Sequence, residues 1–434
     1  MAQSTASSAR YSISPRQRRS AERAAVLMLL ALLTLVHITP TGVAGGDAAV
    51  ERRTTPLADT MVVLAETADA PGQRSLEHFQ ALAEAANGYY ALNAYGCVQF
   101  DFTFAHADGP TGHRGWTRLE GARADYGDMG YGYAVAALQR ALAGAGLPEE
   151  VHLERVIVIS SEEAQRADAG RVVPASTLWL PGDQAIEIPG LRHNARVYVA
   201  NIVFLSERAA LGTWVHELGH TLVARYETDG GYNRIPDRYN DAEAARTNGQ
   251  VGMWDLMGSG SRWGRPEGTS PTHMSSYTQE SAGWLHYRPA ALDQDVVLAS
   301  LENQTMGDPV LTLDDPLSDE PGSYYILEAR DSDAPFGAPE SGVVIYHVTR
   351  DREAGRTVVG ILNAQTGDVE ARRLGLPYQR PTLHGIASAD GDREHVLAGG
   401  LVVRLLAESF SPYRATVRIA RYLPGSSKGG AGTN

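Results

Sequence analysis

The chain has 434 residues, a formal net charge of −13 at pH 7 and an ordinary share of apolar residues. This length exceeds what one hydrophobic core usually organises, so we expect a larger domain and a second, smaller one. The acidic balance argues against a nucleic-acid-binding protein. Cys97 is the only cysteine, which excludes an intramolecular disulfide.

The first 44 residues have the layout of a secretory signal. Five arginines lead into an apolar run over 26–38, and small residues at 42–44 offer a cleavage site. This run is too short to span a bilayer comfortably, so we expect no stable membrane insertion after cleavage. A linker over 45–58 follows, and the secreted chain would carry a net charge of −17, because the leader carries +4. An uncleaved anchor is the alternative.

Apolar periodicity predicts a mixed α/β domain over 59–288. The run over 155–160 is apolar without alternation, which is typical of a strand in a sheet that is covered on both faces. One helix is expected to begin at Ser75 and another to cover 133–142. The expected strands are 61–64, 98–104, 155–160 and 196–205.

The next predicted helix carries His216, Glu217 and His220 in an H-E-x-x-H pattern. Two histidines four residues apart share one helix face, so both can bind one metal ion, and the spacing suits zinc. Glu217 would lie beside the ion, where its carboxylate takes a proton from water and passes it to the leaving amine. Leucines and a valine give this helix an apolar face, which argues against two histidines on a solvated surface.

A catalytic zinc ion needs a third protein ligand and one open position. No histidine lies between His220 and Met257, which leaves carboxylates as the local candidates. The candidates in this interval are Glu227, Asp229, Asp237, Asp241, Glu243 and Asp255.

Past Trp284 the pattern changes to short strands separated by Gly, Pro and Asp clusters. We expect a β-sandwich-like domain over 289–423, followed by a disordered tail over 424–434. Asp331 and Asp333 could bind calcium, but they lack a full ligand loop and more often form a solvated turn. The clearest strands are 324–328, 342–348, 401–406 and 415–422.

Several segments together resemble the immune inhibitor A family of secreted zinc metallopeptidases, within the metzincin group. The zinc helix and the Trp-Asp-Leu-Met sequence are the specific ones, and the others support them. The segments are 87–96, 216–222, 252–258, 273–285, 324–330 and 342–348. The resemblance implies a metzincin-like catalytic domain with a mixed sheet and an active-site helix. It also implies that Met257 forms a methionine turn beneath the ligand histidines.

The chain departs from the metzincin pattern after the second histidine. Val223 and Tyr226 occupy the positions where metzincins have a helix-breaking glycine and a third ligand. We therefore expect the helix to continue to residue 228. The family often has a Pro-Asp-x-Tyr sequence after the helix, and 236–239 supplies it after an insertion. Asp237 is our choice of third ligand on this basis.

Other roles and ligands stay open. Asp229 is the next choice of ligand, and both aspartates would otherwise form turns. A second donor to the transition-state oxyanion is expected beside the metal, and His273 or Tyr277 could serve, with a structural role as the alternative for each. The resemblance suggests 196–205 as an edge strand that pairs with extended substrate.

The leading hypothesis is a secreted zinc endopeptidase that hydrolyses protein or peptide substrates. One alternative is a zinc aminopeptidase with a glutamate as third ligand, for example Glu243. The other is a secreted binding protein with a peptidase fold and little or no activity, because no third ligand reaches the zinc.

Overall fold

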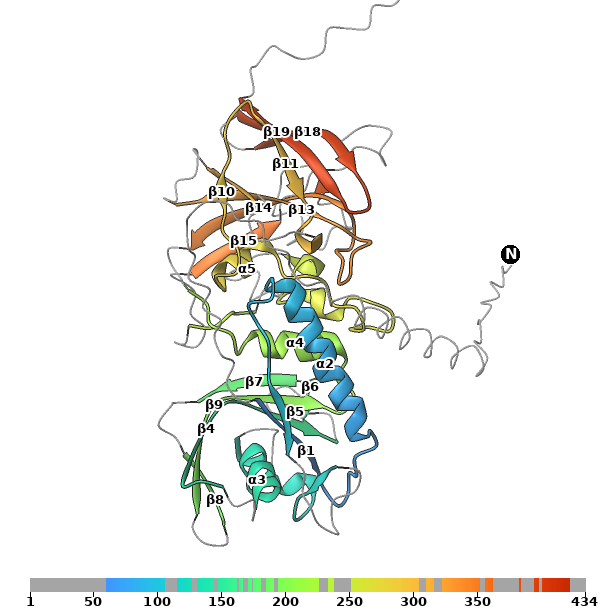
Figure 1. Cartoon of the computed structure of the whole chain (residues 1–434), viewed down its shortest axis with the longest axis vertical. Helices are drawn as coiled ribbons and strands as arrows, with labels where there is room; N and C mark the ends of the chain where they lie inside the picture. Colours follow the sequence, from blue (N-terminus) through green and yellow to red (C-terminus); the bar gives the residue numbers. More distant parts are fainter. Residues whose placement is uncertain are drawn as a thin grey trace, which may run out of the picture. The chain divides into compact units, whose positions relative to one another are not determined.

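A seven-stranded mixed sheet lies at the centre of the first half of the chain in a computed structural model (Figure 1). Its strands are β1 (Thr60–Glu66), β2 (Phe102–Ala105), β3 (Thr117–Arg118), β4 (Glu150–Ser160), β7 (Ala175–Trp179), β8 (Ala185–Ile188) and β9 (Ala195–Ser206). The order is β2-β1-β4-β9-β7, with β3 beside β1 and β8 beside β9. β2, β3 and β4 each pair with β1 in parallel, and β4 pairs with β9 in parallel. β7 and β8 run antiparallel to β9.

The structure describes most of the chain between residues 60 and 421. The described ranges are 60–105, 115–126, 131–143, 147–161, 164–166, 171–173, 175–180, 185–190, 194–225, 233–237, 251–303, 310–315, 322–351, 356–361, 382–383, 394–397 and 400–421. The predicted leader, linker and tail lie outside these ranges. Arg53–Asn434 forms one compact unit, and the division predicted at residue 288 falls within it and stays a prediction.

Helices cover both faces of the mixed sheet. α2 (Leu76–Asn93) and α4 (Leu211–Gly219) pack on one face, and α3 (Tyr131–Leu142) packs on the other, so that α4 lies above the sheet and α3 below it in Figure 1. Within β4, Ile157 belongs to the cluster under α4, whereas Val158 belongs to the cluster under α3. The predicted mixed α/β fold is therefore confirmed, and burial on both faces explains the unbroken apolar run.

Two further sheets follow, and their strands are largely antiparallel. The first contains β10 (Arg288–Pro289), β12 (Leu311–Asp314), β13 (Tyr324–Arg330), β14 (Gly342–Asp351), β15 (Arg356–Ile361) and β16 (Thr382–Leu383). The second contains β11 (Asp295–Ala299), β17 (Glu394–Leu397), β18 (Leu401–Ser409) and β19 (Arg414–Arg421). Leu327 and Ile345 of the first sheet share one buried apolar cluster with Val403 and Val417 of the second.

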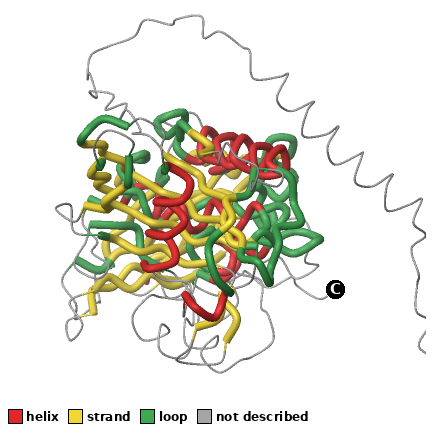
Figure 2. Tube along the Cα trace, turned by 90° about the horizontal axis from the view of Figure 1, so that it is seen from below, coloured by secondary structure: helices red, strands yellow, loops and turns green. Residues whose placement is uncertain are grey.

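Figure 2 shows that strands make up far more of the described chain than helices do. Short elements complete it: the hairpin of β5 (Ala164–Arg166) and β6 (Arg171–Val173), the 3-10 turns η1 (Arg123–Tyr126), η3 (Gly252–Trp254), η4 (Ser259–Arg262) and η5 (Leu301–Asn303), and the helix α5 (Ser276–Ser281). Within the described residues, no helix combines the length and apolar character that crossing a membrane would need.

Two predictions about strands were wrong. The strand predicted over 98–104 begins only at Phe102, because the Asn87 amide bonds both backbone groups of Phe100, at 2.7 and 2.8 Å, and replaces a strand partner. The strand predicted as the substrate-binding edge is β9, which lies between β4 and β7. Both sides of β9 are therefore occupied, and β7 is the antiparallel edge at this end of the described sheet.

Candidate metal centre

α4 presents two of the predicted site residues, and a third follows at its end. His216 and Glu217 lie on the helix, and His220 is its C-cap residue. Trp214, at the centre of α4, is fully buried in the apolar cluster against the sheet. The two histidine side chains are buried as well, so packing holds their orientations.

Gly219 allows Met257 to approach the helix turn that carries both histidines. A Cβ at this position would lie 2.7 Å from the Met257 sulfur, closer than real Cβ contacts come, and 3.3 Å from the Tyr90 hydroxyl, which is a tight contact. Met257 itself is fully buried. Its thioether therefore packs directly against the turn between Glu217 and His220.

Three ligand atoms converge at the end of α4. Asp237 Oδ1 lies 3.1 Å from His216 Nε2 and 3.3 Å from His220 Nε2, and the two Nε2 atoms are 3.2 Å apart. Two ligands that each lie about 2.0–2.1 Å from a tetrahedral zinc ion are roughly 3.3 Å apart. The three measured separations therefore fit one zinc ion.

The opposite ring nitrogens are held by backbone carbonyls. His216 Nδ1 lies 3.0 Å from the Leu256 oxygen, and His220 Nδ1 lies 2.8 Å from the Ile235 oxygen. A carbonyl can only accept a hydrogen bond, so each Nδ1 carries a proton and each Nε2 faces the cluster. Metal-binding histidines are oriented in this way.

In the metal-free chain, a proton bound by His220 supplies part of the positive charge that a metal ion would bring. Burial lowers the pKa of His220, but its hydrogen bond to Asp237 and the charges of Asp237 and Glu217 outweigh burial and raise that pKa to about 9. Burial raises the pKa of Asp237, but the hydrogen bonds and charges of the two histidines hold it well below its usual range. The cluster therefore favours positive charge at its centre.

The path of the chain from His220 to Asp237 differs from the prediction. α4 ends at Gly219, because Leu222 N–H bonds the Gly219 carbonyl at 3.0 Å in a tighter turn. Val223 then forms an antiparallel bridge with Arg234, so the prediction of a helix to residue 228 was wrong. The pairing satisfies backbone groups that a longer helix would have used, and it returns the chain to the histidines at Asp237.

Two arginines hold this return path. Arg155 of β4 is buried, and its Nε donates to the Thr221 hydroxyl at 2.6 Å. Arg234 donates from Nη1 to the Thr221 carbonyl at 2.9 Å. Sequence reasoning missed both, although Arg155 is a charged residue at the start of an apolar strand.

The segment that contains this cluster matches a known family. Residues 183–285 match the immune inhibitor A peptidase M6 catalytic domain. The match includes α4, Asp237 and Met257, and the family is the one that the sequence predicted. This match of residues 183–285, called the M6 segment below, supports a metallopeptidase that acts on proteins or peptides, and the matched family is typically extracellular. A comparison with curated proteins finds no match.

The edge strand β7 contacts α4 directly. Thr177 donates from its hydroxyl towards Glu217 Oε2 at 2.7 Å, with the Glu217 carbonyl 3.1 Å away. Trp179 Nε1 donates to the His220 carbonyl at 3.0 Å. Sequence reasoning missed both residues because it predicted no strand there.

Asp255 stabilises the loop that carries Met257 and is not among the three converging ligand atoms. Its side chain is fully buried and accepts hydrogen bonds from Met257 N–H at 2.8 Å and from the Thr278 hydroxyl at 2.6 Å. The N–H and hydroxyl of Ser275 also donate to it. Its lone pairs are therefore used, and it is no candidate for the third ligand. The other carboxylates considered, Glu227, Asp229, Asp241 and Glu243, lie outside the described residues.

The two predicted oxyanion donors are buried. His273 and Tyr277 are each 1% exposed. His273 Nδ1 lies 3.0 Å from Gln279 Nε2, and Tyr277 belongs to the apolar cluster that contains Trp254. A role at the oxyanion stays a prediction, because substrate would first have to reach these side chains.

His273 makes the stability of the chain sensitive to acid. Burial, with a contribution from the Arg330 charge, lowers its pKa to about 3 from an ordinary 6.5. Below pH 6.5 the unfolded chain binds a proton that the folded chain does not, so stability falls with pH until the folded pKa is reached.

We expect His273→Gln to flatten this dependence. Between pH 6.5 and 5 its free energy of unfolding should fall by about 2 kcal/mol less than that of the wild type. Urea unfolding in the presence of a chelator measures both slopes. Val417→Ala loses buried surface but no titratable group, so it should keep the wild-type slope. Equal slopes for His273→Gln and wild type would contradict the prediction.

The aspartates considered for calcium lie in a turn. Asp331 Oδ1 accepts from Asp333 N–H at 3.0 Å, and Oδ2 accepts from Asn303 Nδ2 and Tyr413 N–H, each at 3.0 Å. These oxygens accept hydrogen bonds from protein donors, whereas the oxygens of a calcium site are directed at the ion. The arrangement supports turn formation and gives no support to calcium binding.

Proposed function

We propose that the mature chain is a secreted zinc-dependent endopeptidase. The observation that carries the proposal is the convergence of His216, His220 and Asp237 within 3.1–3.3 Å of one another, beside Glu217. Three protein ligands leave one position open at a tetrahedral ion, as catalysis requires. A zinc ion bound there would lower the pKa of a water ligand and polarise the scissile carbonyl.

Glu217 is the proposed general base and acid. Its carboxylate would accept a proton from the attacking water and then deliver that proton to the leaving amine. The Thr177 hydroxyl, 2.7 Å from Oε2, would hold the carboxylate in one orientation. Met257 would form the apolar support below the ligand turn, since its sulfur packs at Gly219.

β7 is the proposed binding strand for substrate. β7 is the edge strand among the described strands of this sheet, so an extended peptide could add beside it and gain main-chain hydrogen bonds, while pockets for alternate side chains give specificity. Thr177 and Trp179, two residues apart on this strand, contact the site helix. A peptide along this edge would extend past the site on both sides, which favours an endopeptidase over an aminopeptidase.

The proposal includes two features of the whole chain. Secretion rests on the leader over 1–44 and on the typically extracellular family. A β-sandwich-like arrangement of residues 289–423 is supported by the apolar cluster that both C-terminal sheets share.

Casein cleavage by the purified mature chain tests the function. We expect cleavage within the casein chain, its loss on treatment with a chelator, and its return when zinc is restored. Release of single N-terminal amino acids alone would favour the aminopeptidase. Substoichiometric zinc without cleavage would favour the inactive binding protein.

A further inference from the structure

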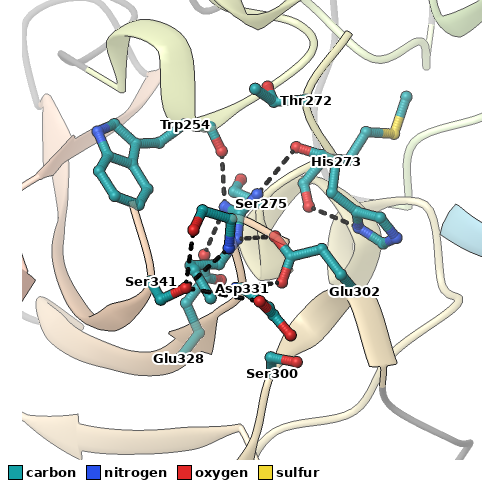
Figure 3. Close-up of polar contacts among 12 residues, drawn as sticks. Trp254, Thr272, His273, Ser275, Ser300, Glu302, Glu328, Asp331 and Ser341 are labelled. Carbon is teal, nitrogen blue, oxygen red and sulfur yellow. Dashed lines mark hydrogen bonds and ion pairs between the residues drawn. The ribbon is translucent and has the colours of Figure 1, made fainter. Parts of the chain in front are cut away.

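Arg330 is a buried cation between the first C-terminal sheet and the loop that carries Met257. It ends β13, outside the segment that matches the M6 family, and its side chain has no exposed surface. Nη1 donates to the Trp254 carbonyl at 2.7 Å, and Nη2 donates to the His273 carbonyl at 3.3 Å. Figure 3 shows these two carbonyls pointing towards the same group. One side chain therefore holds two points of the M6 segment.

Two buried glutamates balance the charge of Arg330. Glu302 Oε1 lies 2.6 Å from Nε, and Glu328 Oε1 lies 2.9 Å from Nη1. Burial alone would lower the pKa of Arg330, but these carboxylates raise it well above its ordinary value, so the guanidinium stays charged. Glu328 also reaches the M6 segment, because its Oε2 accepts from Ser276 N–H at 2.8 Å.

The Trp254 carbonyl is close in sequence to the groups that orient the candidate metal ligands. Two residues later, the Leu256 carbonyl accepts from His216 Nδ1 at 3.0 Å. The next residue, Met257, packs against Gly219. Asp255 fixes this loop from within, and Arg330 fixes it from the C-terminal sheet.

A buried ion network of this kind is weak evidence for stability, because apolar residues of similar size often stabilise a core equally well. Directional contacts are what such a network adds. The planar guanidinium divides its donors between two carbonyls and two carboxylates, which a lysine cannot reproduce. This division points to a role in geometry.

We propose that Arg330 is a positioning residue for the metal centre. It fixes the Trp254 carbonyl and thereby the Leu256 carbonyl that orients His216. The C-terminal sheet then completes the metal centre, and it is more than a separate binding module. This inference rests on the proposed function, because it assumes that His216 binds the metal.

Arg330→Lys in the full mature chain tests the inference. Lysine keeps a positive charge beside Glu302 and Glu328 but loses the fork that reaches both carbonyls. We expect zinc binding to weaken about 10-fold, as for other partners outside the ligand shell. Competition with a chromophoric chelator measures the affinity, and the visible spectrum of the cobalt(II)-loaded chain should change because it reports ligand geometry.

Val417→Ala is the matched control. It removes buried methyl groups from the cluster between the two C-terminal sheets, and it should lower Tm without changing zinc affinity or the cobalt spectrum. If Arg330→Lys does not fold, the triple variant Arg330→Met, Glu302→Gln, Glu328→Gln replaces the network without an unpaired charge. The same 10-fold loss is expected for it.

The outcomes separate the two proposals. A wild-type chain that binds neither zinc nor cobalt would overturn the proposed function. A wild-type chain that binds both, with unchanged affinity and spectrum in the folded Arg330 variant, would overturn only the positioning role.

Discussion

Replacing Glu217 by alanine is expected to remove peptide-bond hydrolysis and to leave zinc binding intact. The Glu217 carboxylate is not among the three converging ligand atoms, and it accepts from Thr177 instead. Loss of a general base costs about 10²–10⁴-fold in rate. The kcat/KM for a quenched fluorescent peptide, measured beside the zinc content of the purified variant, checks both parts.

Two variants control this experiment. Glu217→Gln keeps the size of the side chain and an oxygen that can accept from Thr177, but it cannot take up the proton, so it should be as inactive as the alanine variant. Glu187→Ala changes an exposed glutamate on β8 and should keep full activity. Undiminished hydrolysis by Glu217→Ala would disprove the general-base role. Loss of zinc from that variant would show that the substitution also disturbs the metal ligands.

The parts of the candidate site that local spacing determines were predictable from the sequence. His216 and His220 share a helix face because of the helical period, and Glu217 takes its place from the same turn. The strands β1, β4 and β9 follow in the same way from apolar runs whose side chains meet the clusters on the two sheet faces.

The end of the site helix was not predictable from the same pattern. Val223 and Tyr226 fill the positions of the usual glycine and ligand, and nothing local in them stops a helix. The helix ends at Gly219 in a tighter turn, and the chain beyond it pairs with a later segment through the bridge of Val223 with Arg234. Asp237 could be chosen from its Pro-Asp-x-Tyr context, but the route that brings it back to the histidines depends on that pairing.

Partners that are distant in the chain also escaped sequence reasoning. Thr177 lies 40 residues from Glu217, and Arg330 lies 76 residues from Trp254. Such contacts depend on strand order and on the packing of one sheet against another, which periodicity does not encode. An arginine at one end of an apolar strand run, as at Arg155 and Arg330, is a signal that a buried polar partner exists, but it does not name the partner.

Asp237→Ala is expected to have the largest effect on the metal. Removing one of three ligands should weaken zinc binding by more than the roughly 10–100-fold that loss of an outer partner costs. The zinc affinity of the purified variant, measured by chelator competition, checks this. Glu243→Ala is the discriminating control. It should bind zinc as the wild type does, whereas the aminopeptidase hypothesis requires the reverse result for the two variants.

The same substitution has an effect that needs no metal. In the metal-free chain Asp237 is the main group that raises the pKa of His220 to about 9, against the burial that lowers it. Without the carboxylate, burial remains, so the pKa of His220 should fall, and NMR titration of the ring protons would follow it. Weakened zinc binding with an unchanged His220 pKa would mean that Asp237 acts on the metal from a position other than beside His220. A lower pKa with unchanged zinc affinity would leave the carboxylate as a hydrogen-bond partner and reopen the search for the third ligand among the residues that follow it.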